Sequence, residues 1–450
     1  MESLRYNTLL RMLKLLNVAL LTLPFGICWY LAYADEIAAP FYRKGNFLIV
    51  ALFAILYVTY GRIYEAFRVS LSPSSELVMS QILAAGISDI IMYVIIWILT
   101  RHFPAVWPLF CALIAQGALS ALWSYSSNRW YFHHFQAKKT AIIYEKRENF
   151  ENLIAEYGLQ KKFNVVASSD FQTAFTNNLE ILEDVEAVFL CEISSHERNI
   201  VLKHCIANGI QVYLIPKIGD VLMSGAKQMH MFHLPMMLAE RYNPNPEYLL
   251  VKRAFDIVVS ALAMIISSPV MLCVAIAIKA TDGGPVFYRQ CRLTKDGKTF
   301  DVLKFRSMRV DAEKDGVARL SSGSSDDRIT PVGRFIRKCR IDELPQFINI
   351  FMGDMSFVGP RPERPEIAVQ YEETLPEFSL RLQAKAGLTG YAQVYGKYNT
   401  TPYDKLQMDL MYIANPNFAE DLKIMFATVK ILFKPESTEG VQQGQTTAAK

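Results

Sequence analysis

Hydrophobic residues are concentrated in long runs in the first third of the chain. Four such runs cover residues 15–34, 47–60, 77–99 and 106–123. Each can approach or cross the hydrocarbon core of a bilayer, which is about 30 Å thick, although the second is short unless it extends past residue 61. The pattern predicts a four-helix transmembrane domain over residues 1–135.

Basic residues lie mainly on one side of this predicted bundle. Positions 5, 11, 14, 62, 68, 129, 138 and 139 fall on the side of the first residue, and positions 43, 44 and 101 on the other. Because Lys and Arg favour the cytoplasmic side, we expect residue 130 onward to lie in the cytoplasm. An alternative is that residues 5–34 form a cleaved signal peptide, for which the apolar run is rather long.

One carboxylate, Asp89, lies inside the third run. An ionisable residue within a membrane segment is a functional candidate by default. A structural role near a helix end or in the bundle interior is the alternative.

The hydrophobic pattern changes at about residue 136. Apolar runs of four to six residues, such as AIIY and AVFLC, alternate with helical patterns, which is typical of a parallel α/β unit. We therefore predict a Rossmann-like α/β domain over residues 136–245, ending in the linker sequence NPNP. The first turn reads YEKRE at residues 144–148 and has no glycine, so we expect no convincing dinucleotide site, although binding of some other nucleotide stays open.

A fifth apolar run covers residues 254–280 and is broken at its centre by the sequence SSP. Twenty-seven residues at about 1.5 Å each are long enough to cross a bilayer, so a fifth transmembrane helix is one interpretation. Basic residues flank both ends, however, which favours both ends on the cytoplasmic side. We therefore predict a re-entrant membrane helix that breaks at Ser268 and Pro269, where the serine hydroxyls satisfy the backbone groups freed by the proline.

Composition limits the remaining interpretations. The 450 residues allow two or three domains. The net charge of +4 is small and indicates little as a total, and we expect no nucleic-acid partner. The seven cysteines include no CxxC pair, so neither a disulfide framework nor a zinc site is expected. Residues 288–309 hold seven Lys or Arg against two Asp, which suits a phosphate-rich ligand or an anionic membrane surface.

Candidate chemistry is concentrated between residues 330 and 362. Asp342 and Glu343 follow a basic run that includes Arg337, and Arg361 stands between two prolines. Pro345 favours a helix start, and a helix N-terminus favours anions, either these carboxylates or a bound phosphate. The ordinary alternative is a surface helix with solvated charges.

Residues 250–435 resemble the bacterial sugar transferase family, the monotopic phosphoglycosyl transferases. The resemblance rests on the sequences KRAFDIVVS, SSP, GGPVFYRQCRLTKDGKTF, KFRSM, DDRITPVGRFIRK, DELPQ, GDMSFVGPRP, GLTGYAQVYGK and DLMYIAN, in this order. The preceding helices and α/β unit resemble those of the large subgroup, the polyprenyl-phosphate hexose-1-phosphate transferases. Two positions depart from the family pattern: the turn Cys339–Arg340–Ile341, and Lys397 in place of the usual arginine, which keeps the charge but loses the bidentate fork.

The resemblance implies an enzyme that transfers a sugar 1-phosphate from a UDP-sugar to undecaprenyl phosphate and releases UMP. This reaction starts the synthesis of exopolysaccharide, capsule or O-antigen. By position, Asp342 is the residue that carries the covalent phosphosugar, and Glu343 is its acidic partner. The family is magnesium-dependent, and adjacent carboxylates suit Mg²⁺, so we expect Asp342 and Glu343 to hold the ion. The cations expected to contact substrate phosphates are Arg337, Arg361, Lys304, Arg306 and Lys397.

The expected architecture is therefore a membrane α-helical bundle, a Rossmann-like α/β domain and an α/β monotopic catalytic domain at residues 246–435 with a re-entrant membrane helix. A disordered tail is expected at residues 436–450. The expected location is the bacterial inner membrane, with the catalytic domain facing the cytoplasm. Self-association, the hexose and the polysaccharide pathway stay open. The alternative functions are a non-catalytic scaffold or regulator of polysaccharide export, and a nucleotide-sugar dehydratase or oxidoreductase.

Overall fold

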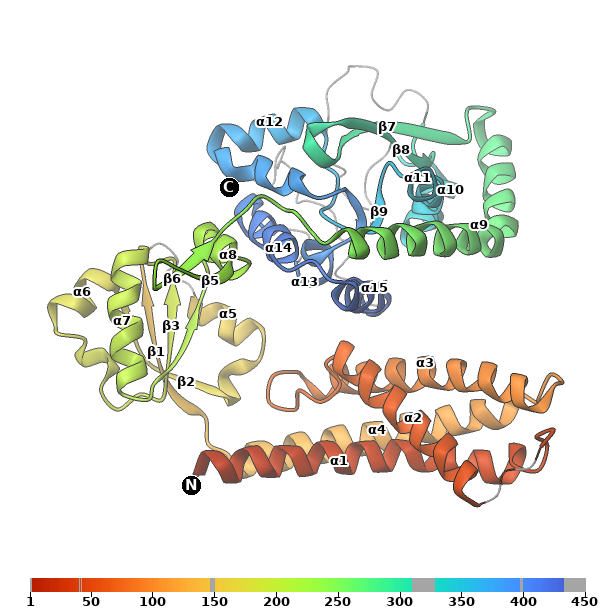
Figure 1. Ribbon diagram of the computed structural model, residues 1–450, viewed down its shortest axis with the longest axis horizontal. Helices are drawn as coiled ribbons and strands as arrows, with labels where there is room; N and C mark the ends of the chain where they lie inside the picture. The colour runs from red at the N-terminus through yellow and green to blue at the C-terminus, as the bar shows by residue number, and fades with distance from the viewer. Residues whose placement is uncertain are drawn as a thin grey trace. The chain divides into compact units, whose positions relative to one another are not determined.

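The computed structural model describes residues 2–39, 41, 43–145, 150–309, 328–396 and 400–432, and these fall into two compact units. The units are Met1–Ile215 and Pro216–Lys450 (Figure 1). The tail expected from residue 436 and the candidate Lys397 lie outside the described residues.

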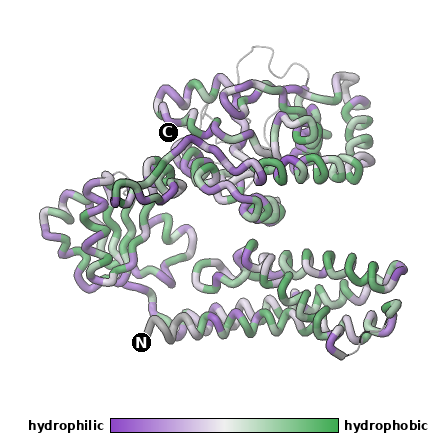
Figure 2. Tube along the Cα trace, in the orientation of Figure 1, coloured by the Kyte–Doolittle hydropathy of each residue, from purple (hydrophilic) through white to green (hydrophobic). Residues whose placement is uncertain are grey.

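The first unit begins with a group of long apolar helices. They are α1 (Glu2–Cys28), continued by the π-helical turn η1 (Trp29–Tyr33), α2 (Arg43–Ile63), α3 (Ser74–Thr100) and α4 (Trp107–His134). All four are long and apolar enough to cross a membrane, as predicted (Figure 2). Asp89 lies in the bundle interior, 5% exposed, and within the described residues neither of its carboxylate oxygens has a hydrogen-bond partner.

A parallel sheet follows, which confirms the predicted α/β region. Its order is β2-β1-β3-β4. Alternate residues of β1 enter opposite cores: Ala141 and Ile143 pack with α6 and α7, whereas Ile142 packs with α5 (Figure 1). This alternation follows from the two-residue period of a strand. The elements are β1 (Lys138–Tyr144), α5 (Phe150–Glu156), η2 (Leu159–Lys161), β2 (Phe163–Asp170), α6 (Phe171–Thr176), η3 (Glu180–Leu182), β3 (Ala187–Cys191), α7 (Ser195–Ala207) and β4 (Gln211–Leu214).

The second unit begins at Pro216, ahead of the boundary expected at residue 246. Its first helix, α8 (Ile218–Ser224), places Val221 in the same core as residues of α14. Gly225 lies so close to α14 that a Cβ there would stand 2.5 Å from the carbonyl oxygen of Ala414. Residues 216–245 therefore belong with the second unit, because the apolar face of α8 is covered there. The hairpin β5 (Lys227–Met231) and β6 (Leu234–Leu238) completes this segment.

The rest of the second unit consists of short elements around one long helix. The long helix is α9 (Pro246–Asp282), and the hairpin β7–β8 follows it. The remaining elements are β7 (Phe287–Leu293), η4 (Lys295–Gly297), β8 (Thr299–Phe305), α10 (Pro331–Lys338), η6 (Ile341–Glu343), α11 (Gln346–Met352), β9 (Ser356–Val358), α12 (Pro365–Thr374), η7 (Pro376–Gln383), β10 (Gly387–Thr389), α13 (Tyr391–Tyr395), α14 (Pro402–Ala414) and α15 (Phe418–Leu432).

Helix α9 changes direction near Pro269 (Figure 1). Pro269 has no N–H to donate to Ile265, and the Ser268 hydroxyl donates to that carbonyl instead, at 2.7 Å. The Ser267 hydroxyl donates to the carbonyl of Ala263 at 2.6 Å. The predicted hydroxyl bonds are therefore present at the bend.

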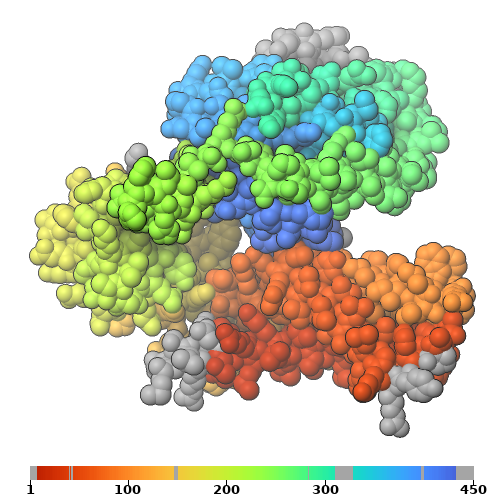
Figure 3. Space-filling view, viewed as in Figure 1, coloured from red at the N-terminus to blue at the C-terminus, as the bar shows by residue number. Residues whose placement is uncertain are grey.

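Both arms of α9 pack against short elements of the second unit. In the first arm, Arg253 donates to the carbonyls of Ile350 and Phe351, each at 2.8 Å. In the second arm, Val274 and Ile278 pack with buried side chains of β8 and α10. Much of the apolar surface between these contacts is exposed, for example Ile266 at 77%. In the space-filling view the first arm lies on the surface of the second unit (Figure 3).

Candidate active site

The predicted acidic pair lies on η6, a single 3₁₀ turn between α10 and α11. It therefore precedes α11 and is not part of that helix's first turn. The chain leaves α10 through Arg340, whose φ of 53° is left-handed and reverses its direction. Helix α10 begins with the Thr330 hydroxyl accepting from the N–H of Gly333 at 3.0 Å. Gly333 also lies so close to the carbonyl of Ser307 that no side chain fits between them, which fixes α10 against the end of the β8 segment.

Two segments distant in the sequence bring charged side chains to η6. Lys304 comes from β8, and its Nζ lies 3.2 Å from Oε1 of Glu343. Arg361 comes from the loop after β9, and its Nη2 lies 3.6 Å from the same oxygen. Two of the predicted phosphate-binding cations are thus paired with the predicted acidic partner of Asp342.

The two carboxylates have different protonation equilibria. Burial, followed by the negative charge of Glu343, raises the pKa of Asp342 to about 6, although Lys304 and Arg337 oppose the rise. Burial also acts to raise the pKa of Glu343, but the charges of Lys304, Arg361 and Arg340 outweigh it and lower that pKa to about 2. Adjacent acids whose environments separate their pKa values have distinct chemical roles. Asp342 is therefore the more basic of the two carboxylates, and Glu343 is the more readily ionised.

Arg337 lies in the last turn of α10 and carries an unsatisfied donor. Its Nη1 is buried and has no hydrogen-bond partner within the described residues. A buried guanidinium nitrogen without an acceptor is costly, and an oxygen of a bound anion would satisfy it.

Arg306 has a different environment from the other predicted cations. It is 7% exposed, and its Nε donates to the carbonyl of Pro285 at 2.7 Å. Its backbone N–H donates to the carbonyl of Val286 at 3.0 Å. These bonds tie the end of β8 to the start of β7, and phosphate binding by Arg306 stays a prediction.

Asn349, which none of the sequence motifs indicated, fixes the strand that carries Lys304. Asn349 is 3% exposed on α11. Its Oδ1 accepts from the N–H of Leu303 at 2.9 Å, and its Nδ2 donates to the carbonyl of Asp301 at 2.8 Å. The available signal was two amides, Gln346 and Asn349, in an otherwise apolar helix.

The donors in this site fit a hard cation. Within the described residues no group of three or more His, Cys, Asp or Glu is arranged to hold a metal. Mg²⁺, however, is commonly held by one or two carboxylates together with substrate phosphates and water. Asp342 and Glu343 offer such oxygens, so their chemistry fits the ion.

The site lies within a segment of the chain that matches a known protein family. Residues 247–435 match the family described as bacterial sugar transferase. The chain is 37% identical over 236 residues, 51% of it and 54% of the relative, to a UDP-N-acetylgalactosamine-undecaprenyl-phosphate N-acetylgalactosaminephosphotransferase of Aeromonas hydrophila. It is 43% identical over 185 residues to the UDP-glucose:undecaprenyl-phosphate glucose-1-phosphate transferase of Escherichia coli K12, covering 40% of the chain and 39% of the relative.

A third relative is matched over almost its whole length. It is the exopolysaccharide production protein PSS of Rhizobium leguminosarum, 39% identical over 190 residues, which are 40% of the chain and 94% of the relative. The chain spans about half or less of the length of the first two relatives.

Proposed function

Because the chain belongs to the bacterial sugar transferase family, we propose that it transfers a sugar 1-phosphate from a UDP-sugar to undecaprenyl phosphate and releases UMP. The observation that carries the proposal is the Asp342–Glu343 pair, in which cations hold Glu343 while Asp342 stays basic. The names of the relatives, which combine UDP-sugars with undecaprenyl phosphate, support the substrate classes.

Asp342 supplies the nucleophile in the first half of the proposed reaction. One carboxylate oxygen forms a bond to the phosphorus that bears the sugar. The bond from that phosphorus to the bridging oxygen breaks, and UMP leaves with this oxygen and its electron pair. The product is an acyl phosphate, so one difficult displacement becomes two easier ones.

The lipid acceptor completes the second half. A phosphate oxygen of undecaprenyl phosphate attacks the same phosphorus, and the bond to Asp342 breaks. The carboxylate is regenerated, and the lipid carries a diphosphate linked to the sugar. No oxidant or reductant is needed.

The cations and Glu343 supply charge rather than covalent chemistry. Arg337 has a free buried donor for a phosphate oxygen, and Arg361 exposes 47% of its side chain beside Glu343. Lys304, on β8, also lies beside Glu343. Mg²⁺ held by Asp342 and Glu343 would neutralise phosphate charge when bound. Arg306 and Lys397 are the remaining proposed phosphate contacts.

Helix α9 is proposed to enter and leave the membrane on the same side. Both of its arms contact one catalytic unit, which supports a return instead of a crossing. The exposed apolar bend would lie in lipid, and the serine hydroxyls supply the backbone partners that non-regular structure at membrane depth requires. The catalytic unit would then face the cytoplasm of the bacterial inner membrane, and the product would start exopolysaccharide, capsule or O-antigen synthesis.

An assay of UMP release tests the proposed function. Membranes containing the full chain are mixed with Mg²⁺, undecaprenyl phosphate and, in turn, the UDP derivatives of glucose, galactose, N-acetylglucosamine and N-acetylgalactosamine. We expect lipid-dependent UMP release with at least one of these donors. A well-expressed chain that releases no UMP with any of them would favour the scaffold alternative.

A further inference from the structure

The loop that carries Arg361 is held through its backbone carbonyls. We call residues 360–363 the arginine loop; it reads PRPE. Its two prolines have no N–H to donate, so the carbonyls must supply much of its anchoring. Four successive carbonyls accept a hydrogen bond: Pro360 from the Gly387 N–H (2.9 Å), Arg361 from Arg381 Nη2 (2.8 Å), Pro362 from Arg292 Nη1 (3.0 Å) and Glu363 from the Leu293 N–H (2.9 Å).

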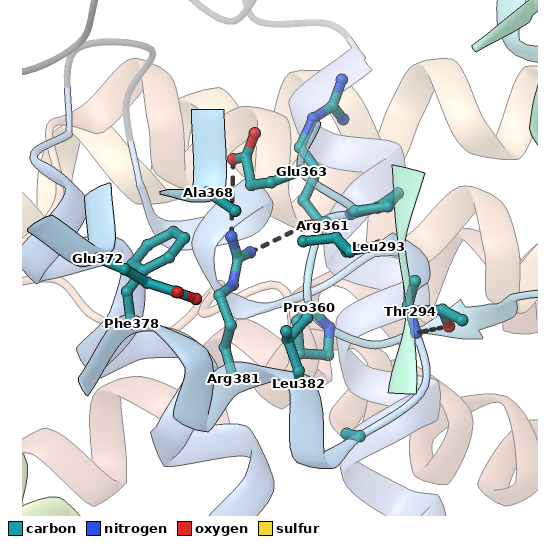
Figure 4. A pocket seen from close by; sticks show the side chains of 13 residues that line it. Leu293, Thr294, Pro360, Arg361, Glu363, Ala368, Glu372, Phe378, Arg381 and Leu382 are labelled. Carbon is teal, nitrogen blue, oxygen red and sulfur yellow. Dashed lines mark hydrogen bonds and ion pairs between the residues drawn. The ribbon is translucent and has the colours of Figure 1, made fainter. Parts of the chain in front are cut away.

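Arg381 is the donor that reaches the carbonyl of Arg361 itself. Arg381 is 2% exposed, and its Nη2 also lies 2.7 Å from Oδ2 of Asp409, which is 1% exposed on α14. Its Nη1 lies 3.6 Å from Oε1 of Glu363, and its guanidinium carbon lies 4.9 Å from the centre of the Phe378 ring (Figure 4). A buried guanidinium requires such compensation, because an unpaired buried charge is strongly destabilising.

The space behind the arginine loop is a support rather than a ligand site. A pocket lined by Pro360, Arg361, Arg381 and Phe378 has a volume of about 10 Å³. That is room for about one water molecule. The Arg361 side chain points away from Arg381 (Figure 4). Its Nη2 lies 3.6 Å from Oε1 of Glu343. The contacts around Arg381 therefore act on the backbone of Arg361, whereas Glu343 faces the end of its side chain.

We infer that Arg381, held by Asp409, is a positioning residue that sets the orientation of Arg361 toward the phosphates of the UDP-sugar. This inference rests on the proposed function. The prolines restrict the backbone on both sides of Arg361, so the remaining freedom lies in the rotation of the Arg361 carbonyl. The bond from Arg381 removes that freedom. A planar guanidinium makes this bond and the contacts with Asp409 and Glu363 at once, which a lysine ammonium cannot reproduce in the same plane.

A double-mutant cycle distinguishes positioning from general stability. The variants Arg381→Lys and Asp409→Asn are made in the full chain, each with and without Arg361→Ala. We expect each to lower kcat/KM for the UDP-sugar at least about tenfold alone, and less than about twofold beside Arg361→Ala, because both act through Arg361. An equal fold loss in the two backgrounds would overturn the inference. Adduct formation followed by intact mass extends the measurement to slow variants.

Asp421→Asn is the matched control. Asp421 is 5% exposed on α15 and pairs with Lys252 at 2.9 Å, so it is another buried carboxylate with a cationic partner. Within the described residues it makes no bond to the arginine loop. We expect a comparable loss of thermal stability with kcat/KM within about twofold of the parent. A tenfold loss from Asp421→Asn would show that any buried charge defect has this effect, and would overturn the inference.

Hydrogen exchange measures how firmly the arginine loop is held in the absence of substrate. The amides of Leu293 and Gly387 donate to its outer carbonyls. We expect both amides to exchange faster in Arg381→Lys and Asp409→Asn than in the parent chain. In Asp421→Asn their exchange rates should be unchanged. Unchanged exchange in all three would contradict the role of Arg381. A parent chain without UMP release would contradict the proposed function instead, and the exchange result would still decide how the arginine loop is held.

Discussion

The chain contains two α/β regions that are held together in different ways. In the first unit, β1 is bonded to neighbours on both edges, and alternate side chains such as Ile142 and Ile143 fill separate apolar cores. In the second unit, polar side chains bond directly to backbone carbonyls, as Arg381 does to Arg361 and Arg253 does to Ile350. A sheet distributes its stability over many equivalent bonds. A site built from loops depends on a few side chains, so single polar substitutions should affect it far more.

The strongest test of this difference is the same chemical change in both regions. Asp342→Asn removes the proposed nucleophile, and we expect UMP release and the phosphosugar adduct to fall at least about 10³-fold. Asp170→Asn changes a carboxylate of the first unit that caps α6 by accepting from the Gln172 N–H at 3.0 Å. Asparagine caps as well as aspartate, so stability and activity should be unchanged. UMP release and intact mass measure both variants, and an active Asp342→Asn enzyme would refute the assigned nucleophile.

A second test concerns the bend of α9. Replacing Ser268 and Pro269 together with leucine restores the backbone bond to Ile265 and removes the Ser268 hydroxyl from the bend. We expect the helix to straighten toward a crossing and activity to be lost, because its arms can no longer contact one catalytic unit.

Topology is measured with single cysteines at Asn245 and Asp282 in a cysteine-free background. An impermeant thiol reagent should reach neither in intact cells of the parent chain, and both after permeabilisation. In the leucine variant, the cysteine at 282 should become accessible from outside. Labelling of that position from outside in the parent would rule out the re-entrant arrangement.

The features that could be predicted from the sequence differ between the same two regions. The apolar helices and the strands of the first unit were predictable, because one side-chain period repeats over many residues. The acidic pair and its cations were identified from motifs. The bonds of Asn349 and the Arg381–Asp409 pair were not predictable, since they join residues distant in the chain without any local pattern. The compact second unit starts at Pro216, and no local pattern indicates this, because the partner of α8 lies far along the chain, on α14.

Substitutions at Asn349, beside the site, and at Ile143, in the sheet, should differ by a smaller amount in the free energy of unfolding and in activity. Asn349→Ala leaves the Leu303 N–H and the Asp301 carbonyl without their partner, and we expect a loss of about 2–4 kcal/mol in the free energy of unfolding. UMP release should fall as well, because β8 positions Lys304. Ile143→Val in the sheet should cost about 1 kcal/mol and leave activity unchanged. Denaturant unfolding and the UMP assay measure both, and equal effects on activity would break the comparison.

The smallest expected effect is the response of the first unit to a dinucleotide. A Rossmann cofactor site directs free backbone N–H groups of the turn after β1 at a pyrophosphate, and glycines let the backbone approach it. Here the first of these groups, the N–H of Glu145, donates to the carbonyl of Cys191 at 3.2 Å. Glu145 also adds a negative charge where a pyrophosphate would lie, and the sequence from 144 to 148 has no glycine. Calorimetric titration of the full chain with NADH should therefore give no binding heat, and UMP release should not change when NADH is added. Micromolar affinity that is lost on deleting residues 144–148 would show that the turn rearranges to bind a cofactor, and that the regular α/β region has a ligand site of its own.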